Sequence, residues 1–399
     1  MKSRYDVAVV GGGIVGMSTA MALAARGRSV LVLDAADHIA AHQSGRNSGV
    51  IHAGLYYRPG SLKARLCAEG REALYRFCEE NGVPHRRCGK LVVATKQRDV
   101  AGLDELERRG RANGLASLRR LTAAQLVEYE PAATGLAGLW VPQTGVVDFR
   151  VVTEAYATQA RLTGAEIVLR ARVNRIVSNN DGIHVDTTAG DTRADFLVNC
   201  AGLHSDRVAR LAGADPGVRI VPFRGEYFDL KPQRASLVRG LIYPVPDPDL
   251  PFLGVHLSRT IHDHVHAGPN AVLAFSRHGY SRLIVSPRDL VDAATYPGFW
   301  RMARRHWRSA LAELRRSFSK RLFARSIQEL VPALTEADFV AGGSGVRAQA
   351  IDRSGKLVDD FHIVRSPRAL HVLNAPSPAA TASLAIGRYI VTQVLEQTT

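Results

Sequence analysis

The pattern of apolar and polar residues at the N-terminus predicts a strand–helix–strand unit. The apolar run Tyr5–Val10 ends at three consecutive glycines, Gly11–Gly13, as a buried parallel strand does. Residues 14–26 are rich in alanine, methionine and leucine and predict a helix, after which Ser29–Asp34 returns as a second strand. A helix that joins two parallel strands crosses over with a right hand. We therefore expect an α/β fold to begin here.

The remaining pattern divides the chain into helical and strand-rich stretches. Helical periodicity is found over residues 61–81, 97–113, 149–163 and 292–322, and in a closing helix over 379–396. Short strands are predicted at Lys90–Thr95, Glu166–Leu169, Ile183–Thr187 and Phe196–Gly202. Residues 218–286 are strand-rich and predict an antiparallel sheet with a proline-rich corner at Pro244, Pro246, Pro248 and Pro251. This sheet suits a substrate-binding domain.

Composition places the chain among soluble globular proteins. Its 399 residues are enough for one large or two interleaved domains, and 46% are hydrophobic and 22% charged. No apolar run reaches the roughly 18–20 residues that span a bilayer, and the N-terminus leads directly into a strand rather than a signal peptide. The four cysteines have no zinc-ligand spacing. We expect reduced thiols, no metal site and a cytoplasmic location.

The net charge of +15 is concentrated in one segment. Residues 301–325 contain nine basic residues and one acidic residue. Apolar residues recur there at helical spacing, while arginines occupy another face: Trp300, Trp307, Leu311, Leu314, Phe318 and Leu322 against Arg301, Arg304, Arg305, Arg308 and Arg315. Such a helix could dock peripherally on anionic lipid at the inner membrane face. We favour the simpler interpretation, a helix packed on the core with a solvated basic face.

The glycines after the first strand form a dinucleotide-binding fingerprint. Gly11, Gly13 and Gly16 match the G-x-G-x-x-G spacing, and Asp34 ends the second strand 18 residues after Gly16. The glycines allow a tight turn and close approach of a pyrophosphate to the helix N-terminus. A carboxylate at Asp34 would bind a ribose and repel a 2′-phosphate. The motif therefore favours FAD or NAD over NADP.

A loop rich in small residues follows, from Ser44 to Tyr57. The backbone N–H groups, hydroxyls and guanidinium of this loop could form a nest for phosphate or a flavin ring. The residues concerned are Ser44, Arg46, Asn47, Ser48 and Gly49. His52 could act as a general base, since neutral imidazole is suited to removing a hydroxyl proton near pH 7. His42 could in principle tether a flavin. Two later segments suit close approach to a nucleotide or a flavin: the strand end at Gly202, and the helix start with Ala379 and Thr381.

Three basic residues lie in strand patterns that predict burial. Arg224 needs a carboxylate or phosphate partner, which Glu226 or a substrate carboxylate could supply. His256 and Arg347 raise the same alternatives. The residues alone do not decide between an internal ion pair and a substrate site.

Seven strings in order give the chain a family resemblance. They are Asn47–Gly54, Pro222–Phe228, Ile242–Pro248, Pro251–His256, Gly268–Ala274, Gly345–Gln349 and Asn374–Ala380. On these strings, the chain resembles the FAD-dependent L-2-hydroxyglutarate dehydrogenases and oxidases of the D-amino-acid oxidase-like superfamily. Two departures are Arg46, where histidine is expected, and Arg353–Lys356, which replaces a usual Asp-Gly-Lys.

The resemblance implies an α/β fold in which a Rossmann-like FAD-binding domain is interleaved with an α+β substrate domain carrying an antiparallel sheet. We predict the FAD-binding domain at 1–95, 146–217 and 327–399, and the substrate domain at 96–145 and 218–326. Non-covalent FAD would oxidise L-2-hydroxyglutarate, a small dicarboxylate, to 2-oxoglutarate by hydride transfer from C2 to flavin N5. His52 or, less favoured, His256 would be the base. Candidates for binding the substrate are Tyr56, Lys63, Arg224, Tyr227, Tyr243 and Arg347.

Alternatives remain at this point. A flavin-dependent amine or amino-acid oxidase of the same superfamily would have the same fingerprint. A basic flavoprotein acting on tRNA is a remote alternative, and no nucleic-acid partner is expected because the basic segment lacks an aromatic platform for single strands. The electron acceptor could be oxygen, a quinone or a carrier protein.

Overall fold

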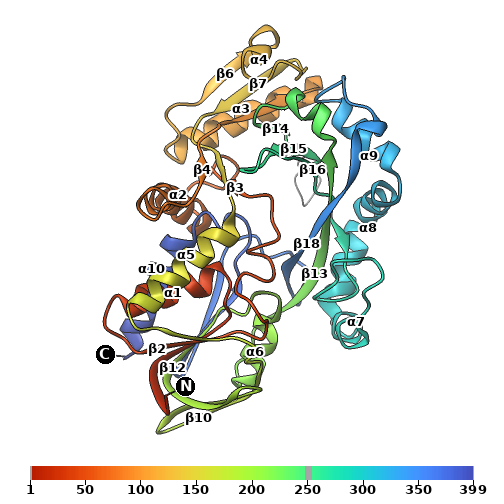
Figure 1. Cartoon of the computed structure of the whole chain (residues 1–399). Helices are drawn as coiled ribbons and strands as arrows, with labels where there is room; N and C mark the ends of the chain where they lie inside the picture. The colour runs from red at the N-terminus through yellow and green to blue at the C-terminus, as the bar shows by residue number, and fades with distance from the viewer. Residues whose placement is uncertain (1, 248–253, 399) are drawn as a thin grey trace.

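Two large sheets organise the computed structural model, which describes residues 2–247 and 254–398 (Figure 1). The first, eight-stranded, comprises β1 (Arg4–Val10), β2 (Val30–Leu33), β9 (Glu166–Val168), β10 (Val173–Asn179), β11 (Gly182–Thr187), β12 (Gly190–Asn199), β19 (His362–Ser366) and β20 (Ala369–Asn374). Its centre is parallel: β1 pairs with β2 and β12, and β12 pairs with β20. The predicted strand–helix–strand unit is confirmed.

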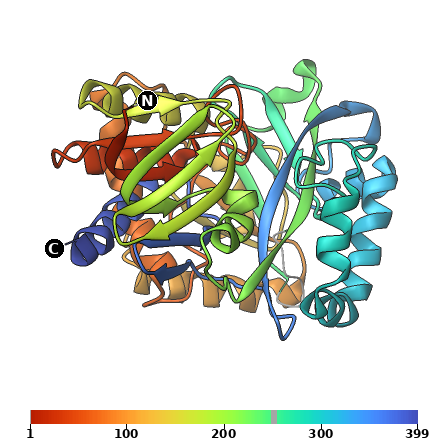
Figure 2. The same ribbon diagram turned by 90° about the horizontal axis from the view of Figure 1, so that it is seen from below.

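Three helices cover one face of this sheet, α1 (Ile14–Ala24), α5 (Phe149–Leu162) and α10 (Ser383–Thr398), and α2 (Leu62–Glu80) packs on α10. Helix α1 is apolar on nearly all sides, and Met17, Ala20 and Leu23 are fully buried among its neighbours. An all-round apolar helix is stable in water only when it is enclosed in this way. On the sheet's other face, seen in Figure 2, lies α6 (Ser205–Leu211).

The second, nine-stranded, sheet is largely antiparallel. It comprises β5 (Lys90–Ala94), β6 (Arg119–Thr122), β7 (Ala137–Val141), β13 (Val218–Leu230), β14 (Leu241–Pro244), β15 (His256–Arg259), β16 (Val265–Gly268), β17 (Val272–Leu273) and β18 (Phe339–Asp352). The long strands β13 and β18 pair antiparallel over most of their length and run between the two halves of the molecule (Figure 1). The mixed α/β fold predicted from the sequence is confirmed.

Shorter elements complete the chain. A third sheet joins β3 (Val50–Ile51), β4 (His85–Arg86) and β8 (Gly145–Val147). The remaining helices are α3 (Gln97–Ala112), α4 (Ala123–Tyr129), α7 (Pro287–Ala294), α8 (Pro297–Phe318) and α9 (Lys320–Gln328). Pro248 and Pro251 of the predicted corner lie outside the described residues.

The predicted helical block over 292–322 is divided into three helices. Pro287 and Pro297 each occupy the first turn of a helix, where proline lacks a donor that the helix does not need. Ser319 ends α8 and caps α9 through its side chain. The apolar stripe of α8 does not pack on the core as we favoured, since Trp307 is 56% exposed and Phe318 is 70% exposed. Among the described residues, none of the helices is both long and apolar enough to cross a membrane.

Sheet membership bears on the predicted domain ranges. Strands β5 and β18 belong to the nine-stranded sheet, although their residues fall within the ranges given to the FAD-binding domain. The long strands β13 and β18 pair with each other, and strands of the two large sheets alternate along the chain, so the chain passes from one sheet to the other several times. The domain ranges remain a proposal.

Candidate active site

The turn after β1 is built for a nucleotide. Gly11 has a φ of +117°, and a Cβ there would lie 2.3 Å from the carbonyl oxygen of Cys200. A Cβ on Gly16 would lie 1.9 Å from the carbonyl oxygen of Gly11. Neither position accepts a side chain, so the N-terminus of α1 meets the strand ends closely enough for a pyrophosphate to approach its N–H groups.

Asp34 closes this turn from the end of β2. Its Oδ2 accepts a hydrogen bond from Gly12 N–H (2.5 Å) and its Oδ1 from Ala36 N–H (2.7 Å). Two backbone donors fix the carboxylate beside the glycine turn, and each oxygen keeps lone-pair capacity for a ribose hydroxyl.

The loop after residue 43 packs on α1 and stabilises itself. Ser44 Oγ accepts a hydrogen bond from Ile14 N–H (2.9 Å) and so caps the first turn of α1. Asn47 donates to the carbonyl oxygens of Gln43 and Ser44 and accepts from Gly49 N–H. Asn47 therefore shapes the loop, which positions Ser44 against the nucleotide turn, and Ser48 is partly buried. Gly49 has a φ of +67°, which favours glycine.

Arg46 points toward a different partner. Its guanidinium lies 4.2 Å from the centroid of the Tyr280 ring, a cation–π contact. The Tyr280 hydroxyl is 2.6 Å from Nδ1 of His42, which gives His42 a partner within the protein. The backbone of Arg46 also faces Gly345, where a Cβ would lie 2.3 Å from the Arg46 carbonyl oxygen. The loop is therefore pressed against β18.

The segment before α10 reaches back to the same region. Thr381 is fully buried, and its Oγ1 accepts a hydrogen bond from the backbone N–H of His52 (3.0 Å). Ala379 is also buried, and Gly202 adopts a φ of +52° at the end of the neighbouring β12. Helix α10 begins at Ser383 rather than 379, since the residues after Pro378 first form a tight turn.

His52 follows β3 and has one ring nitrogen without a partner. Its Nε2 lies 3.2 Å from Ser377 Oγ, whereas Nδ1 is buried and makes no hydrogen bond within the described part of the chain. Burial, together with the positive charge of Lys90, lowers the pKa of His52 to about 3. The imidazole is therefore neutral near pH 7, the form that can accept a proton.

His256 lies at the start of β15 against Tyr243. The two rings stack with centroids 3.8 Å apart and an interplanar angle of 20°. Nδ1 lies 3.0 Å from the carbonyl oxygen of Gly254, so this nitrogen carries the hydrogen and Nε2 the lone pair. Burial lowers its pKa to about 3 as well. Both candidate bases are thus neutral and close to the same tyrosine-rich region.

The sequence reasoning missed Lys90, the first residue of β5. The side chain is 1% exposed, and its Nζ lies 4.3 Å from the ring centroid of Tyr56 and 4.9 Å from that of Tyr243. Burial lowers its pKa to about 7. The available signal was a lysine that begins an otherwise apolar strand, Lys90–Ala94.

A second group of side chains lies in this region and consists of Arg347, Tyr227 and Tyr243. The charge of Arg347 lowers the pKa of both tyrosines against the larger upward effect of burial, and it also lowers the pKa of His256. The Tyr56 hydroxyl is buried without a hydrogen-bond partner among the described residues. The structure therefore brings together His52, Tyr56, Lys90, Tyr227, Tyr243, His256 and Arg347.

Two predicted substrate ligands have partners within the protein. Lys63 Nζ lies 2.9 Å from Asp359 Oδ1, although its charge still acts on His52. Arg224 donates from Nε and Nη2 to Glu226 Oε1, at 3.2 and 3.1 Å.

Strand register separates Arg224 from Arg347. Arg224 lies opposite Val346, whereas Arg347 lies opposite Phe223. Alternation along the strands places the two guanidinium groups on opposite faces of the β13–β18 pair. The internal ion pair that the sequence allowed is the one formed, and we leave Arg224 out of the proposed substrate site.

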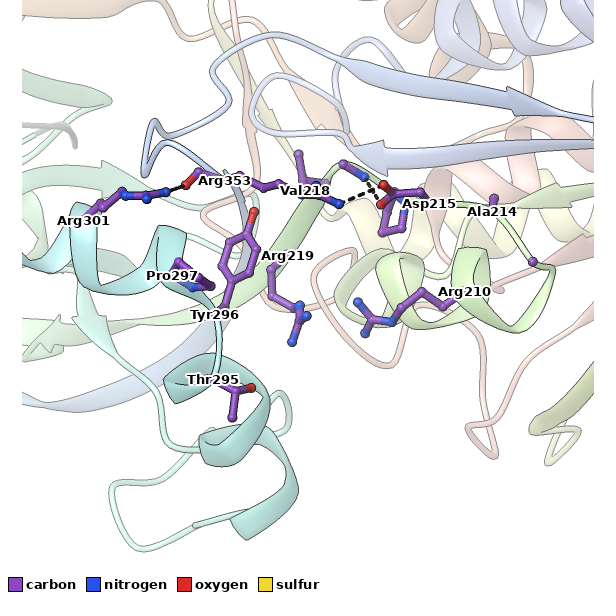
Figure 3. A pocket seen from close by; sticks show the side chains of 13 residues that line it. Arg210, Ala214, Asp215, Val218, Arg219, Thr295, Tyr296, Pro297, Arg301 and Arg353 are labelled. Carbon is purple, nitrogen blue, oxygen red and sulfur yellow. Dashed lines mark hydrogen bonds and ion pairs between the residues drawn. The ribbon is translucent and has the colours of Figure 1, made fainter.

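A large cavity lies elsewhere (Figure 3). Its volume is about 710 Å³, and its lining includes Arg210, Arg219, Arg301 and Arg353 but none of the predicted site residues. These arginines already have partners: Arg210 pairs with Asp206, Arg219 with Asp292 and Arg353 with Asp215, and Arg301 donates to the carbonyl oxygen of Arg353.

Comparison with known proteins agrees with this geometry. The FAD dependent oxidoreductase family matches residues 6–393. The chain belongs to this family. Curated relatives of this FAD dependent oxidoreductase include the L-2-hydroxyglutarate dehydrogenase of Indibacter alkaliphilus, 47% identical over 96% of this chain and 97% of the relative. The L-2-hydroxyglutarate dehydrogenase of Escherichia coli K12 is 44% identical over 98% and 93%.

Solved structures show the same fold. The L-alpha-glycerophosphate oxidase of Mycoplasma pneumoniae, with FAD bound, aligns with a TM-score of 0.82 at 23% identity, over 99% of this chain and 95% of that one. The protein is an FAD-dependent oxidoreductase, and the predicted cofactor is confirmed. Three features of the structure fit FAD: the absence of room for a Cβ at Gly11 and Gly16, the capped N-terminus of α1 and the fixed carboxylate of Asp34.

Proposed function

We propose that this protein oxidises L-2-hydroxyglutarate to 2-oxoglutarate. Near full-length identity of 44–47% to relatives named for this activity carries the proposal. The cluster around His52 and Arg347 supports it, because a dicarboxylate needs cations and a neutral base at close range. Bound FAD would supply the acceptor for the C2 hydrogen and its two electrons.

His52 takes the hydroxyl proton in this proposal. With Nε2–H donating to Ser377, the buried Nδ1 keeps a free lone pair for the substrate hydroxyl. A dianion bound beside the ring raises its pKa by electrostatic attraction, so that proton acceptance becomes favourable when substrate is present. His256 is the second candidate, through Nε2.

Arg347 binds one carboxylate, with Tyr227 and Tyr243 as hydroxyl donors beside it. A guanidinium pairs with a carboxylate through two parallel hydrogen bonds, which fixes orientation as well as charge. Both tyrosines stay protonated near pH 7 because burial raises the pKa of each. Tyr56 offers a third hydroxyl, and Lys63 contributes charge at longer range.

Cofactor ligands are proposed on the same basis. The pyrophosphate would lie at α1 beside Gly11, Gly13, Gly16 and Ser44, and the ribose at Asp34. A further set would face the flavin end: Arg46, Asn47, Ser48, Gly49, Gly202, Ala379 and Thr381.

Anaerobic flavin reduction tests the activity. The holoenzyme would be mixed with both enantiomers of 2-hydroxyglutarate, lactate, malate, glycerol 3-phosphate and a panel of amino acids and amines. We expect rapid bleaching of flavin absorbance with the L-enantiomer of 2-hydroxyglutarate only. Bleaching by amino acids or amines instead would establish an amine or amino-acid oxidase and overturn the proposal.

We also propose that α8 docks on an anionic bilayer, where a membrane quinone could accept electrons. Trp307, Leu311, Leu314 and Phe318 are exposed and lie on one face, since they follow at intervals of three and four residues. Exposed arginines of the same helix would attract anionic headgroups: Arg301, Arg304, Arg305, Arg308 and Arg315.

Co-sedimentation with vesicles tests the docking. We expect pelleting with vesicles that contain phosphatidylglycerol and none with pure phosphatidylcholine. The triple variant R304E/R308E/R315E should stay in the supernatant, whereas R161E, at an exposed position of α5, should pellet like the parent. Equal pelleting of the triple variant would refute the proposal.

A further inference from the structure

Lys90 is a buried cation to which none of the described residues supplies an anion. No ion pair or hydrogen bond of its ammonium is found among residues 2–247 and 254–398, although the side chain is almost completely enclosed. The contacts that it does make are with the faces of two tyrosine rings. Ring faces compensate only part of the cost of removing an ammonium from water.

Other unsatisfied polar groups gather beside Lys90. The Tyr56 hydroxyl and His52 Nδ1 are both buried without hydrogen-bond partners in the described part of the chain. Tyr56 carries the ring that Lys90 contacts, and Lys90 is the foremost charge acting on His52. Buried polar groups in folded proteins are nearly always paired. A cation, a hydroxyl and a nitrogen lone pair therefore lie close together without partners among the described residues. Together they indicate a site for a polar, anionic ligand.

We propose that Lys90 is the second substrate cation, which pairs with a carboxylate of the substrate and, together with Arg347, selects dicarboxylates over monocarboxylates. This inference rests on the proposed function. The sequence offered Lys63 and Arg224 for this task, but they pair with Asp359 and Glu226. Lys90 Nζ lies 4.9 Å from the ring centroid of Tyr243, and the charge of Arg347 also acts on Tyr243, so both cations lie near the same side chain.

The charge state of Lys90 supports the inference. Its lowered pKa of about 7 leaves much of the ammonium deprotonated above neutral pH in the free protein. The titratable groups that face it are His52, Tyr56, Cys67, Tyr243 and His256, and none of them is an anion near pH 7. A substrate carboxylate would restore the ammonium form, so binding should draw in a proton.

Ligand binding without turnover gives the first test. Glutarate has two carboxylates and no hydroxyl, and its monoamide lacks one charge. Binding of each to the holoenzyme would be followed through the flavin spectrum. We expect the parent to prefer glutarate by at least about 30-fold, the loss typical of an unpaired buried charge.

Variants at Lys90 make the test specific. In K90M the preference for glutarate over the monoamide should fall to within about threefold, because only Arg347 remains to pair with a carboxylate. K90R should recover part of the preference, and K96M, at an exposed lysine paired with Glu329, should keep all of it. An undiminished preference in a folded, FAD-loaded K90M protein would overturn the inference.

Proton uptake gives the second test. Calorimetry of glutarate binding at pH 8, in buffers of different ionisation enthalpy, should show nearly one proton taken up by the parent and almost none by K90M. A purely structural lysine would leave uptake unchanged, and that result would also overturn the inference. Both tests use glutarate, so failure of the parent to oxidise L-2-hydroxyglutarate would refute the proposed function without deciding the role of Lys90.

Discussion

Two clusters of buried ionic groups on the nine-stranded sheet differ in whether those groups have partners within the protein. In the Glu226 cluster, the carboxylate accepts hydrogen bonds from Arg224, Asn270, Arg282 and Ser317. In the Lys90 cluster, formed with His52, Tyr56, Tyr243 and His256, the ammonium has no anion and two other polar groups have no hydrogen-bond partner among residues 2–247 and 254–398. The first cluster is complete within the protein. The second is not complete within the described residues, and in our proposal a substrate carboxylate completes it.

This difference separates structural charges from functional ones. Arg224 and Lys90 are both buried basic residues in strands, and sequence pattern alone made Arg224 the stronger candidate. The two residues differ because Arg224 has a carboxylate nearby. Side chains two residues apart on a strand lie on the same face, so Glu226 can pair with Arg224. We expect perturbation of the two clusters to divide stability from activity.

Replacing His52 by Ala should produce the largest effect. Loss of the base should lower the rate of flavin reduction by L-2-hydroxyglutarate about 10²- to 10⁴-fold, the usual contribution of general base catalysis. The affinity for glutarate should change little. Stopped-flow reduction measures the rate, with H38A at an exposed histidine as control. An unchanged reduction rate would transfer the role to His256.

Replacing Glu226 by Ala should produce the largest loss of stability. It leaves Arg224, which is 5% exposed, without its carboxylate, and an uncompensated buried charge costs about 3–5 kcal/mol. Urea unfolding measures this change, and the double variant R224M/E226L should recover much of it. Glutarate affinity of the folded variant should stay close to that of the parent. A large loss of affinity would mean that the Glu226 cluster belongs to the substrate site.

Replacing Lys90 by Met should act in the opposite direction and stabilise the free protein. Below its folded pKa of about 7, the native state holds an unpaired ammonium, which is destabilising. Between about pH 7 and the unfolded value near 10.4, the unfolded state binds more protons, so stability of the parent rises with pH. The advantage of K90M should therefore be a few kcal/mol at pH 6 and vanish by about pH 10.5. Unfolding across this range measures it; an advantage that grew with pH would contradict the burial of an unpaired charge.

Two tyrosines offer the smallest and most closely matched comparison. Tyr156 is fully buried and its hydroxyl lies 3.0 Å from Ser383 Oγ, so Y156F should cost about 1 kcal/mol. The Tyr56 hydroxyl has no such partner in the described part of the chain, so Y56F should leave the free energy of unfolding unchanged or raise it. Y56F should instead weaken glutarate binding. Equal destabilisation by both changes would remove the distinction.

Much of the proposed cofactor site could be predicted from the local pattern of residues. The glycine spacing, Asp34 and the first two strands lie within one short stretch, where strand and helix periodicity can be read directly. The structure agrees with their placement to within a few residues. The division of 292–322 into three helices and the exposure of its apolar stripe were not predicted, because periodicity identifies a face but not what covers it.

The sequence by itself determined the βαβ unit, the nucleotide turn, the antiparallel character of the later strands and the chemistry available at His52 and Arg347. Only the tertiary structure decided which basic residues have internal partners. Lys90 is separated from Tyr243 and His256 by more than a hundred residues, and it meets them because β5 pairs with β14, whose neighbour is β15. A charge remains open for a ligand when folding surrounds it with apolar and aromatic groups, and long-range strand pairing supplies those neighbours.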